Sequence, residues 1–223
     1  MPRLAIMGFL SLPFITSCAA PEEHVIDAFL AAVRDSREEV IAGVSMVNLP
    51  DADVQSWEIV EVGPESTEPY RLGELNTAFF EAVKAYETKA EEDDRFLNDN
   101  QDNALRYQNE IRKNPDHKFT SGSMAEFQKV WEGKLEELKD LEGKLQAAEE
   151  TLKRERELIF MSASIPLKDT FEGEVAVKKV KVSVNGRSAS KTYALTLRKY
   201  NIVDSETGVT PMAKWIINEI EGE

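Results

Sequence analysis

The clearest pattern of hydrophobic positions in the chain lies between residues 122 and 161. Apolar side chains recur every seven residues, with a second set between them: Met124, Trp131, Leu138, Leu145, Leu152 and Ile159, then Phe127, Leu141 and Ala148. Such a repeat is typical of a helix that pairs along a coiled-coil seam. Lys134 and Glu155 interrupt the second set. The pattern predicts one long helix, which Ser121 or Ser123 caps at its start.

The preceding segment, residues 74–112, repeats apolar side chains at the same spacing: Val83, Ala90, Leu97, Ala104 and Ile111. Residues 113–118 between the two stripes are turn-like. Since each stripe needs an apolar partner, we expect an antiparallel helical hairpin over 74–161, with arms of about 55–60 Å. The seam is expected to be weakest in the polar stretch 91–103. The same seam could also pair arms of two chains, so self-association stays open.

After Pro166 the apolar positions alternate with a period of two, which predicts strands. The first stretch holds Val175 and Val177, and a second stretch of opposite phase holds Val180, Val182 and Val184. The change of phase at Lys178-Lys179 suggests a β-bulge. Asn185-Gly186 is a hairpin turn signal, 192–200 is the expected return strand, and 212–220 is the last strand. Together these segments predict an antiparallel meander.

The N-terminal part predicts a helix from residue 24, with one apolar face, and a strand at 57–62. Residues 63–69, with two prolines, are expected to form a loop. The expected fold class is therefore α+β: a curved antiparallel sheet packed on an N-terminal helix, with a long inserted antiparallel helical hairpin. The predicted organisation is a signal peptide at 1–17, a tether at 18–23, an α+β domain at 24–73 and 162–223, and the hairpin at 74–161.

The first eighteen residues have the features of an export signal: a start with one positive charge, an apolar run at 4–14 and small residues before Cys18. The run is shorter than the roughly 20 residues of a membrane-spanning helix. Ile15-Thr16-Ser17-Cys18 resembles the bacterial lipobox. The resemblance implies cleavage between Ser17 and Cys18, and acyl chains such as palmitate on Cys18. An ordinary signal peptide cut after Ala20, or an apolar N-terminus without export, is the alternative.

Composition limits the classes of partner and chemistry. The chain has 223 residues, 42% of them hydrophobic and 30% charged, and a formal net charge of −14. This charge argues against a nucleic-acid partner, because phosphate binding needs a basic surface. One cysteine excludes an internal disulfide, and two histidines, His24 and His117, argue against a His-rich metal site. No phosphate-binding glycine loop, serine nucleophile elbow or paired-cysteine motif is present.

Residues 24–62 and 166–221 resemble the cystatin-like or NTF2-like superfamily in their order of elements and in the terminal Trp215-x-x-x-x-Ile220. The resemblance implies a curved sheet wrapped on a helix, forming a cone that sometimes holds a small ligand, and Tyr193 and Trp215 are the candidate pocket residues. Asp27 is the nearest candidate for a base, but we expect it to face solvent. The acidic run 91–94 is interpreted as a solvated helix face rather than a calcium site.

Basic residues gather on the predicted sheet. The candidate interaction surface consists of Lys178, Lys179, Lys181, Arg198 and Lys199. Residues 162–223 hold 9 basic and 8 acidic residues, whereas the rest of the chain is strongly acidic. Electrostatic fields of opposite sign on two parts of the chain could steer the docking of a partner. The alternative is a solvated sheet face whose lysines prevent strand-to-strand aggregation.

These observations predict a lipid-anchored protein of the bacterial cell envelope, at the outer membrane if the host is Gram-negative because Ala19 follows Cys18. We expect no cofactor, no metal and no enzymatic activity. The expected role is a non-enzymatic interaction module that uses the helical hairpin, with a membrane anchor and a protein partner in the envelope. A small-molecule-binding module and an exclusion lipoprotein of a phage or plasmid are the alternatives.

Overall fold

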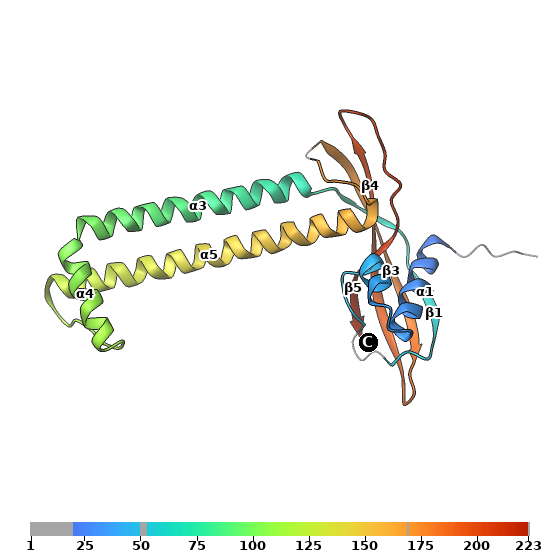
Figure 1. Cartoon of the computed structure of the whole chain (residues 1–223), viewed down its shortest axis with the longest axis horizontal. Coiled ribbons are helices and arrows are strands. Elements are labelled where there is room, and N and C mark those ends of the chain that lie inside the picture. The colour runs from blue at the N-terminus through green and yellow to red at the C-terminus, as the bar shows by residue number, and fades with distance from the viewer. Residues whose placement is uncertain (1–19, 50–52, 169, 223) are drawn as a thin grey trace, which may run out of the picture. The chain divides into compact units, whose positions relative to one another are not determined.

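The computed structural model describes residues 20–49, 53–168 and 170–222. Its elements are α1 (Pro21–Arg34), α2 (Glu38–Val44), β1 (Ser56–Val62), β2 (Ser66–Pro69), α3 (Leu72–Asp99), α4 (Gln101–Lys113), α5 (Gly122–Ala163), β3 (Phe171–Asn185), β4 (Ser190–Asp204) and β5 (Ile216–Gly222). The strands form one open antiparallel sheet in the order β1-β3-β4-β5, and β2 also pairs with β3. The predicted α+β class, with a helical hairpin inserted between strands, is confirmed (Figure 1).

The chain divides into two compact units. The first comprises residues 1–63, 179–197 and 217–223, and the second comprises 64–178 and 198–216. Strands β3 and β4 each contribute one part to each unit. The helical hairpin therefore shares its unit with β2 and with parts of β3 and β4, whereas the sequence predicted it as a separate segment.

The core of the first unit forms where α1 meets the strands. The apolar face that the sequence predicts on α1 is buried, with Ile26 and Phe29 at 0% exposure. Buried strand residues complete this core: Val180, Val182, Val184, Tyr193, Leu195 and Leu197. Strand β1 pairs antiparallel with β3 from Ser56 opposite Asn185 to Val62 opposite Val180. Burying these side chains contributes about 1.5–3 kcal/mol each for the larger ones.

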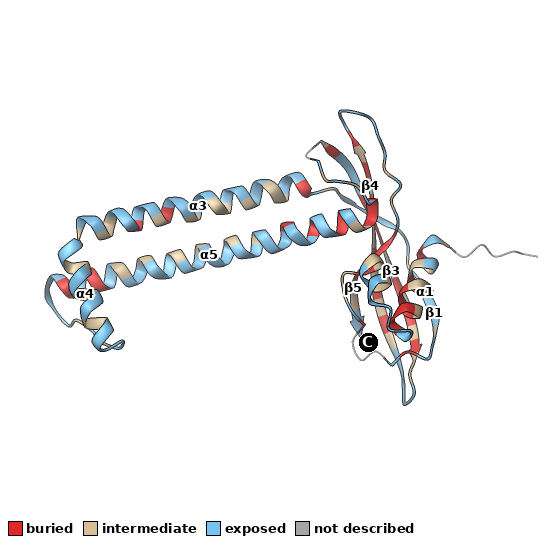
Figure 2. Ribbon diagram, viewed as in Figure 1, coloured by how far each residue is buried: buried red, intermediate tan, exposed pale blue. Residues whose placement is uncertain are grey.

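The second unit contains the hairpin, in which α3 and α5 pack against each other. Helix α5 has 42 residues and so is about 63 Å long. Every predicted seam position of α5 from Met124 to Ile159 is buried or partly buried, including Lys134 and Glu155. Figure 2 shows buried positions mainly near the two ends of α5, with partly buried ones between them. The predicted seam is confirmed.

The first arm differs from the prediction because its helix breaks at Asn100. Helix α3 ends at Asp99, and α4 begins at Gln101 and packs against α5. The backbone N–H and the Nδ2 of Asn100 both donate to the carbonyl of Phe96, at 3.1 and 2.9 Å. A side chain that bonds to the backbone competes with the regular helix, which explains the break. The 28-residue α3 is about 42 Å long, shorter than predicted.

The sequence predicts a change of phase within β3, and the burial pattern shows a change in β3 and also one in β4, which the sequence analysis did not predict. In β3 the buried residues change from Val175 and Val177 to Val180, Val182 and Val184, and in β4 they change from Tyr193, Leu195 and Leu197 to Tyr200, Ile202 and Asp204. Ala176 is buried as well, so β3 buries successive residues at 175–177 and alternate residues from Val180 onward. In both strands the change occurs where the chain passes from one unit to the other.

The bulge predicted at Lys178-Lys179 stays a prediction, and the pairing of β1 with β3 has a register shift of its own between Ile59 and Glu61. At Lys178-Lys179 strand β3 changes its partner from β1 to β2. The predicted loop 63–69 contains β2, whose four side chains are all exposed and show no alternation. The Asn185-Gly186 hairpin is confirmed, the return strand extends to Asp204, and β5 begins at Ile216.

Candidate functional site

The root of the hairpin is held by a buried polar cluster. Tyr200, fully buried, donates a hydrogen bond from its phenol to Oε1 of Glu155 at 2.9 Å. Arg198 donates to Oε2 of Glu155 at 3.3 Å and to Glu68 at 2.9 Å. Burial, and then the charge of Glu155, raise the pKa of the Tyr200 phenol far above its ordinary value. The phenol therefore remains a hydrogen-bond donor, and Glu155, which interrupts the seam in sequence, anchors α5 to β4.

Ser162, in the last turn of α5, adds a second attachment at the root. Its hydroxyl is buried, donates to the carbonyl of Lys214 at 2.7 Å and accepts the backbone N–H of Tyr200 at 3.1 Å. The backbone N–H of Lys214 donates to the carbonyl of Ser162 at 3.0 Å. These bonds satisfy polar groups that would otherwise be costly to bury. They tie the end of α5 to β4 and to the segment before β5.

An ionic cluster crosses the middle of the hairpin. Oδ1 of Asp93 accepts the ammonium groups of Lys134 at 2.8 Å and Lys89 at 3.2 Å, and Lys89 also pairs with Glu137 at 2.6 Å. The hydrogen bond that Lys89 donates to Glu137 is the largest of the contacts that raise the pKa of Lys89. Asp93 is 3% exposed, so the prediction of a solvated acidic run is wrong for this residue. Its Oδ2 has no partner among the described residues.

Aromatic side chains gather near the far end of the hairpin. Phe96 of α3 stacks on Phe127 and Trp131 of α5, with ring centroids 5.5 and 6.3 Å apart, and Tyr107 of α4 meets Phe127 edge to face at 5.9 Å. Lys134 lies 5.3 Å above the ring of Phe96. The sequence pattern placed Phe127 and Trp131 in the seam but did not identify this cluster. The concentration of aromatic residues between 96 and 131 was the available signal.

The loop that joins α4 to α5 is held to the hairpin through Gln128. The Oε1 of this buried side chain accepts the backbone N–H of Phe119 at 2.8 Å, and its Nε2 donates to Glu132 at 2.7 Å. The ring of His117 meets Phe119 edge to face at 4.6 Å. His117 thus lies in a loop, as predicted, and packs against an aromatic ring.

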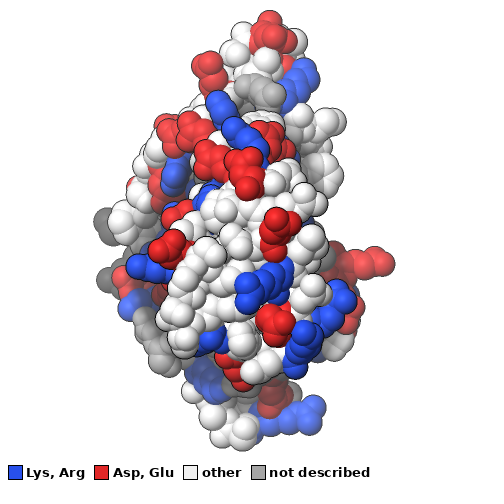
Figure 3. All heavy atoms as spheres, turned by 90° about the vertical axis from the view of Figure 1, so that its left-hand side faces the viewer, with Lys and Arg blue, Asp and Glu red and all other residues white. Residues whose placement is uncertain are grey.

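Part of the surface near the tip of the hairpin is apolar. Leu105 of α4 is 53% exposed and Val130 of α5 is 47% exposed. Figure 3 views the molecule from the side of the hairpin tip, and shows acidic and basic side chains interspersed with uncharged surface. A partner that covered these two side chains would remove their apolar surface from water.

The five residues of the predicted interaction surface have different surroundings. Lys178 pairs with Glu65 at 3.4 Å, and Lys181 pairs with Glu61 at 3.6 Å. The ammonium groups of Lys178 and Lys199 lie 5.3 and 5.1 Å from the ring centre of Trp215. Arg198 belongs to the root cluster, and Lys179 is exposed. The interaction surface stays a prediction, and its arginine has a structural role.

The two predicted pocket residues belong to different units. Tyr193, in the first unit, is 4% exposed and borders a small pocket of about 110 Å³ beside Val184 and Lys191. Trp215, in the second unit, is equally buried and contacts the two lysine ammonium groups. A cone pocket lined by both residues stays a prediction.

Asp27, the candidate base, is exposed as predicted and accepts a hydrogen bond from Nε1 of Trp57 at 2.7 Å. The guanidinium of Arg34 lies 5.5 Å from the ring centre of the same tryptophan. Asp27 therefore positions an aromatic side chain of β1 against α1.

The predicted cleavage and lipidation residues, Ser17 and Cys18, lie outside the described residues. Within the described ranges, no cluster of three or more histidine, cysteine, aspartate or glutamate side chains could hold a metal ion. No helix in the described part of the chain combines the length and the apolar character needed to cross a membrane.

We compared the chain with known proteins in three ways. No protein-family model matches it. A search of curated proteins found no match, and a search of solved structures found none either.

Proposed function

We propose that the protein is a lipid-anchored component of the bacterial cell envelope that works without catalysis, by contacting a protein partner through its helical hairpin. The observation that carries this proposal is that specific contacts brace the hairpin along its whole length. Glu155 and Ser162 hold the root, Asp93 holds the middle, and the stacked Phe96 holds the far end. A braced hairpin can present a fixed surface at a distance from its base, which lowers the entropic cost of binding.

The exposed apolar side chains Leu105 and Val130 near the tip are the proposed contact. A few residues near the centre of an interface contribute most of the binding energy when a partner excludes water from them. Viewed from the side of the hairpin tip, the molecule shows both acidic and basic side chains (Figure 3), a mixture that favours selective association over general adhesion to an anionic surface.

The anchor half of the proposal rests on the lipobox-like Ile15-Thr16-Ser17-Cys18. Two or more acyl chains on Cys18 would hold the protein stably at a membrane, whereas one gives marginal binding. In a Gram-negative host, Ala19 after Cys18 favours the outer membrane. Growing cells with a labelled fatty acid tests this half, with Cys18→Ala as the variant and Ser17→Ala as the control that keeps a small residue. Label on the wild type and the control alone supports the anchor; equal label on all three chains contradicts it.

The contact half is tested by shortening the hairpin. Residues 83–148 are replaced by a short Gly-Ser linker, a deletion that removes α4 and the distal parts of α3 and α5 and keeps Glu155 and Ser162 at the root. A point variant with Leu105→Ser and Val130→Ser tests the tip alone. Chemical cross-linking in intact cells is expected to give a partner adduct with the wild type that both variants lose. An adduct that survives the deletion contradicts this half, whatever the result of the lipid labelling.

A further inference from the structure

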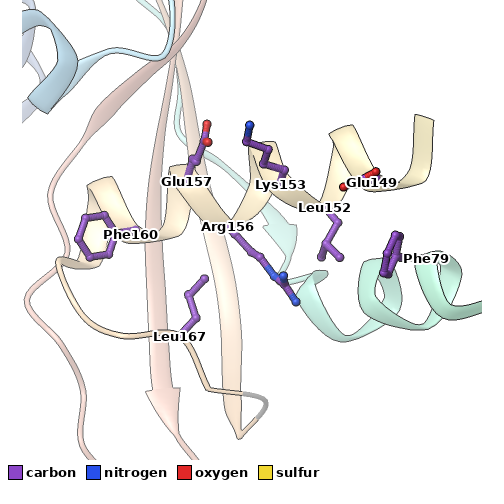
Figure 4. Close-up of a pocket in the computed structure, with 8 residues that line it drawn as sticks. All are labelled: Phe79, Glu149, Leu152, Lys153, Arg156, Glu157, Phe160 and Leu167. Atoms are coloured by element: carbon purple, nitrogen blue, oxygen red, sulfur yellow. The ribbon is translucent and has the colours of Figure 1, made fainter. Parts of the chain in front are cut away.

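A groove opens near the root of the hairpin, between α3, α5 and the segment that follows α5. Its volume is about 500 Å³, and its lining is Phe79, Glu149, Leu152, Lys153, Arg156, Glu157, Phe160 and Leu167 (Figure 4). Pockets for small molecules commonly measure roughly 300–1,000 Å³ and combine apolar walls with a few polar groups. The side chain of Phe160 is exposed although it is large and apolar, at 59%. Apolar side chains in this groove are therefore exposed to water, and a bound ligand would cover them.

The groove is lined by two basic side chains, Arg156 and Lys153, and two acidic ones, Glu149 and Glu157. The guanidinium of Arg156 extends from α5 toward α3, where it donates to Oδ1 of Asn76 at 2.8 Å. Asn76 is neutral, and neither Arg156 nor Lys153 forms an ion pair within the described ranges. In Figure 4, Lys153 and Glu157 point away from the side of α5 that carries Arg156 and Leu152. Glu149 and Glu157 are the acidic groups on the rim.

We propose that this groove binds one long-chain fatty acid. Its hydrocarbon chain would lie against Phe79, Leu152, Phe160 and Leu167, and its carboxylate would pair with Arg156. Each buried methylene contributes about 0.8 kcal/mol, so a long chain on apolar walls binds better than a short one. A guanidinium matches a carboxylate in charge and, through two parallel hydrogen bonds, in geometry. This ligand site is independent of the partner contact proposed for the hairpin tip.

The test measures binding of sodium palmitate by isothermal titration calorimetry, below the concentration at which palmitate forms micelles. The protein is the full chain with Cys18→Ala, so that no attached acyl chain competes. We expect one palmitate per chain and at least tenfold weaker binding with Arg156→Gln. Arg106→Gln, on the exposed surface of α4, is the matched control and should bind like the parent.

The apolar wall is tested with Phe160→Ser, an exposed position where the substitution spares the core, and with Leu135→Ser, 43% exposed on the same helix, as the control. Binding should weaken at least tenfold for the first and stay unchanged for the second. Absence of palmitate binding overturns the proposal. Equal binding of hexadecanol, unchanged binding after Arg156→Gln, or tighter binding of a lysophospholipid overturns it too. None of these outcomes depends on lipid labelling at Cys18 or on cross-linking at the tip.

Discussion

The phenol of Tyr200 and the carboxylate of Glu155 meet in a buried 2.9 Å hydrogen bond, although the two residues are 45 positions apart in sequence. Tyr200 belongs to β4, and Glu155 belongs to the long helix α5. In the heptad pattern Glu155 is a polar residue at a position where an apolar one is expected. In the structure it occupies the seam position at which α5 contacts β4. The bond therefore fixes the base of the arm that we propose as the interaction element.

Removing either partner of this bond should loosen the root of the hairpin. We expect Tyr200→Phe to lower the free energy of unfolding by about 1.5 kcal/mol, because it deletes a hydrogen bond to a charged group. Glu155→Ala should cost about 3 kcal/mol, because Arg198 and Tyr200 lose a buried partner. Urea denaturation followed by circular dichroism measures both changes. In the double variant the two costs should be less than additive; strict additivity would mean that the bond is not formed.

The ionic cluster in the middle of the hairpin should help to determine which helices pair and in which register. We expect Asp93→Ala to lower the free energy of unfolding by about 3 kcal/mol, because Lys89 and Lys134 lose their shared carboxylate. Asp93→Leu combined with Lys134→Leu should restore or raise stability, because an apolar pair often equals a buried ion pair. The combined variant should also form additional oligomers, since polar seam residues specify register. A strictly monomeric combined variant in sedimentation analysis would count against that role.

The seam of α5 could be predicted because seven-residue spacing is a local property of the sequence. The partners of its two polar positions could not, because Lys134 meets Asp93 and Glu155 meets Tyr200 only after distant segments fold together. The break at Asn100 escaped prediction for another reason. The apolar stripe continues from Leu97 to Ala104 across it, so the periodicity alone shows no interruption.

Two glycines should respond to alanine in opposite directions. Gly173 of β3 has φ +150°, and a Cβ there would lie 2.2 Å from the carbonyl oxygen of Asn201, so Gly173→Ala should cost about 2 kcal/mol or more. Gly143 on α5 has open space around it, so Gly143→Ala should stabilise by about 1 kcal/mol through helix propensity. Thermal denaturation measures both. Equal melting temperatures for the two variants would contradict the described packing of β3 on β4.

Asp204 should make stability depend on pH in the acidic range. Its carboxylate accepts hydrogen bonds from Lys168 at 2.7 Å and from Thr170 at 2.9 Å, and the Lys168 bond is the largest cause of its lowered pKa. A lowered folded-state pKa stabilises the protein above the ordinary aspartate value of about 3.9, and this stabilisation is lost as the pH falls below it. We expect the melting temperature of the wild type to decrease as the pH is lowered below 4. In Asp204→Asn the melting temperature should depend less on pH in this range. The exposed Glu136→Gln is the control; parallel curves for all three chains would refute the assignment.

The candidate site was less predictable from sequence than the fold. The basic residues of the sheet suggested a surface, but Arg198 has acidic partners that come from α5 and β2, remote in sequence. The groove near the root joins Phe79 to Leu167, two residues that no local pattern relates. Strand β2 was missed because its four exposed side chains, ending at a proline, carry no alternating signal.

The central claim, that the hairpin is the contact element, is tested most directly by photo-cross-linking in living cells. A photoreactive amino acid replaces Val130 near the hairpin tip in one strain and Val60 on β1 in another, two exposed valines at 47% and 60%. The account predicts a discrete adduct with one envelope protein from position 130 and none from position 60. An adduct from position 60 alone, or no adduct from position 130 in cells that express the protein at its native level, would contradict it.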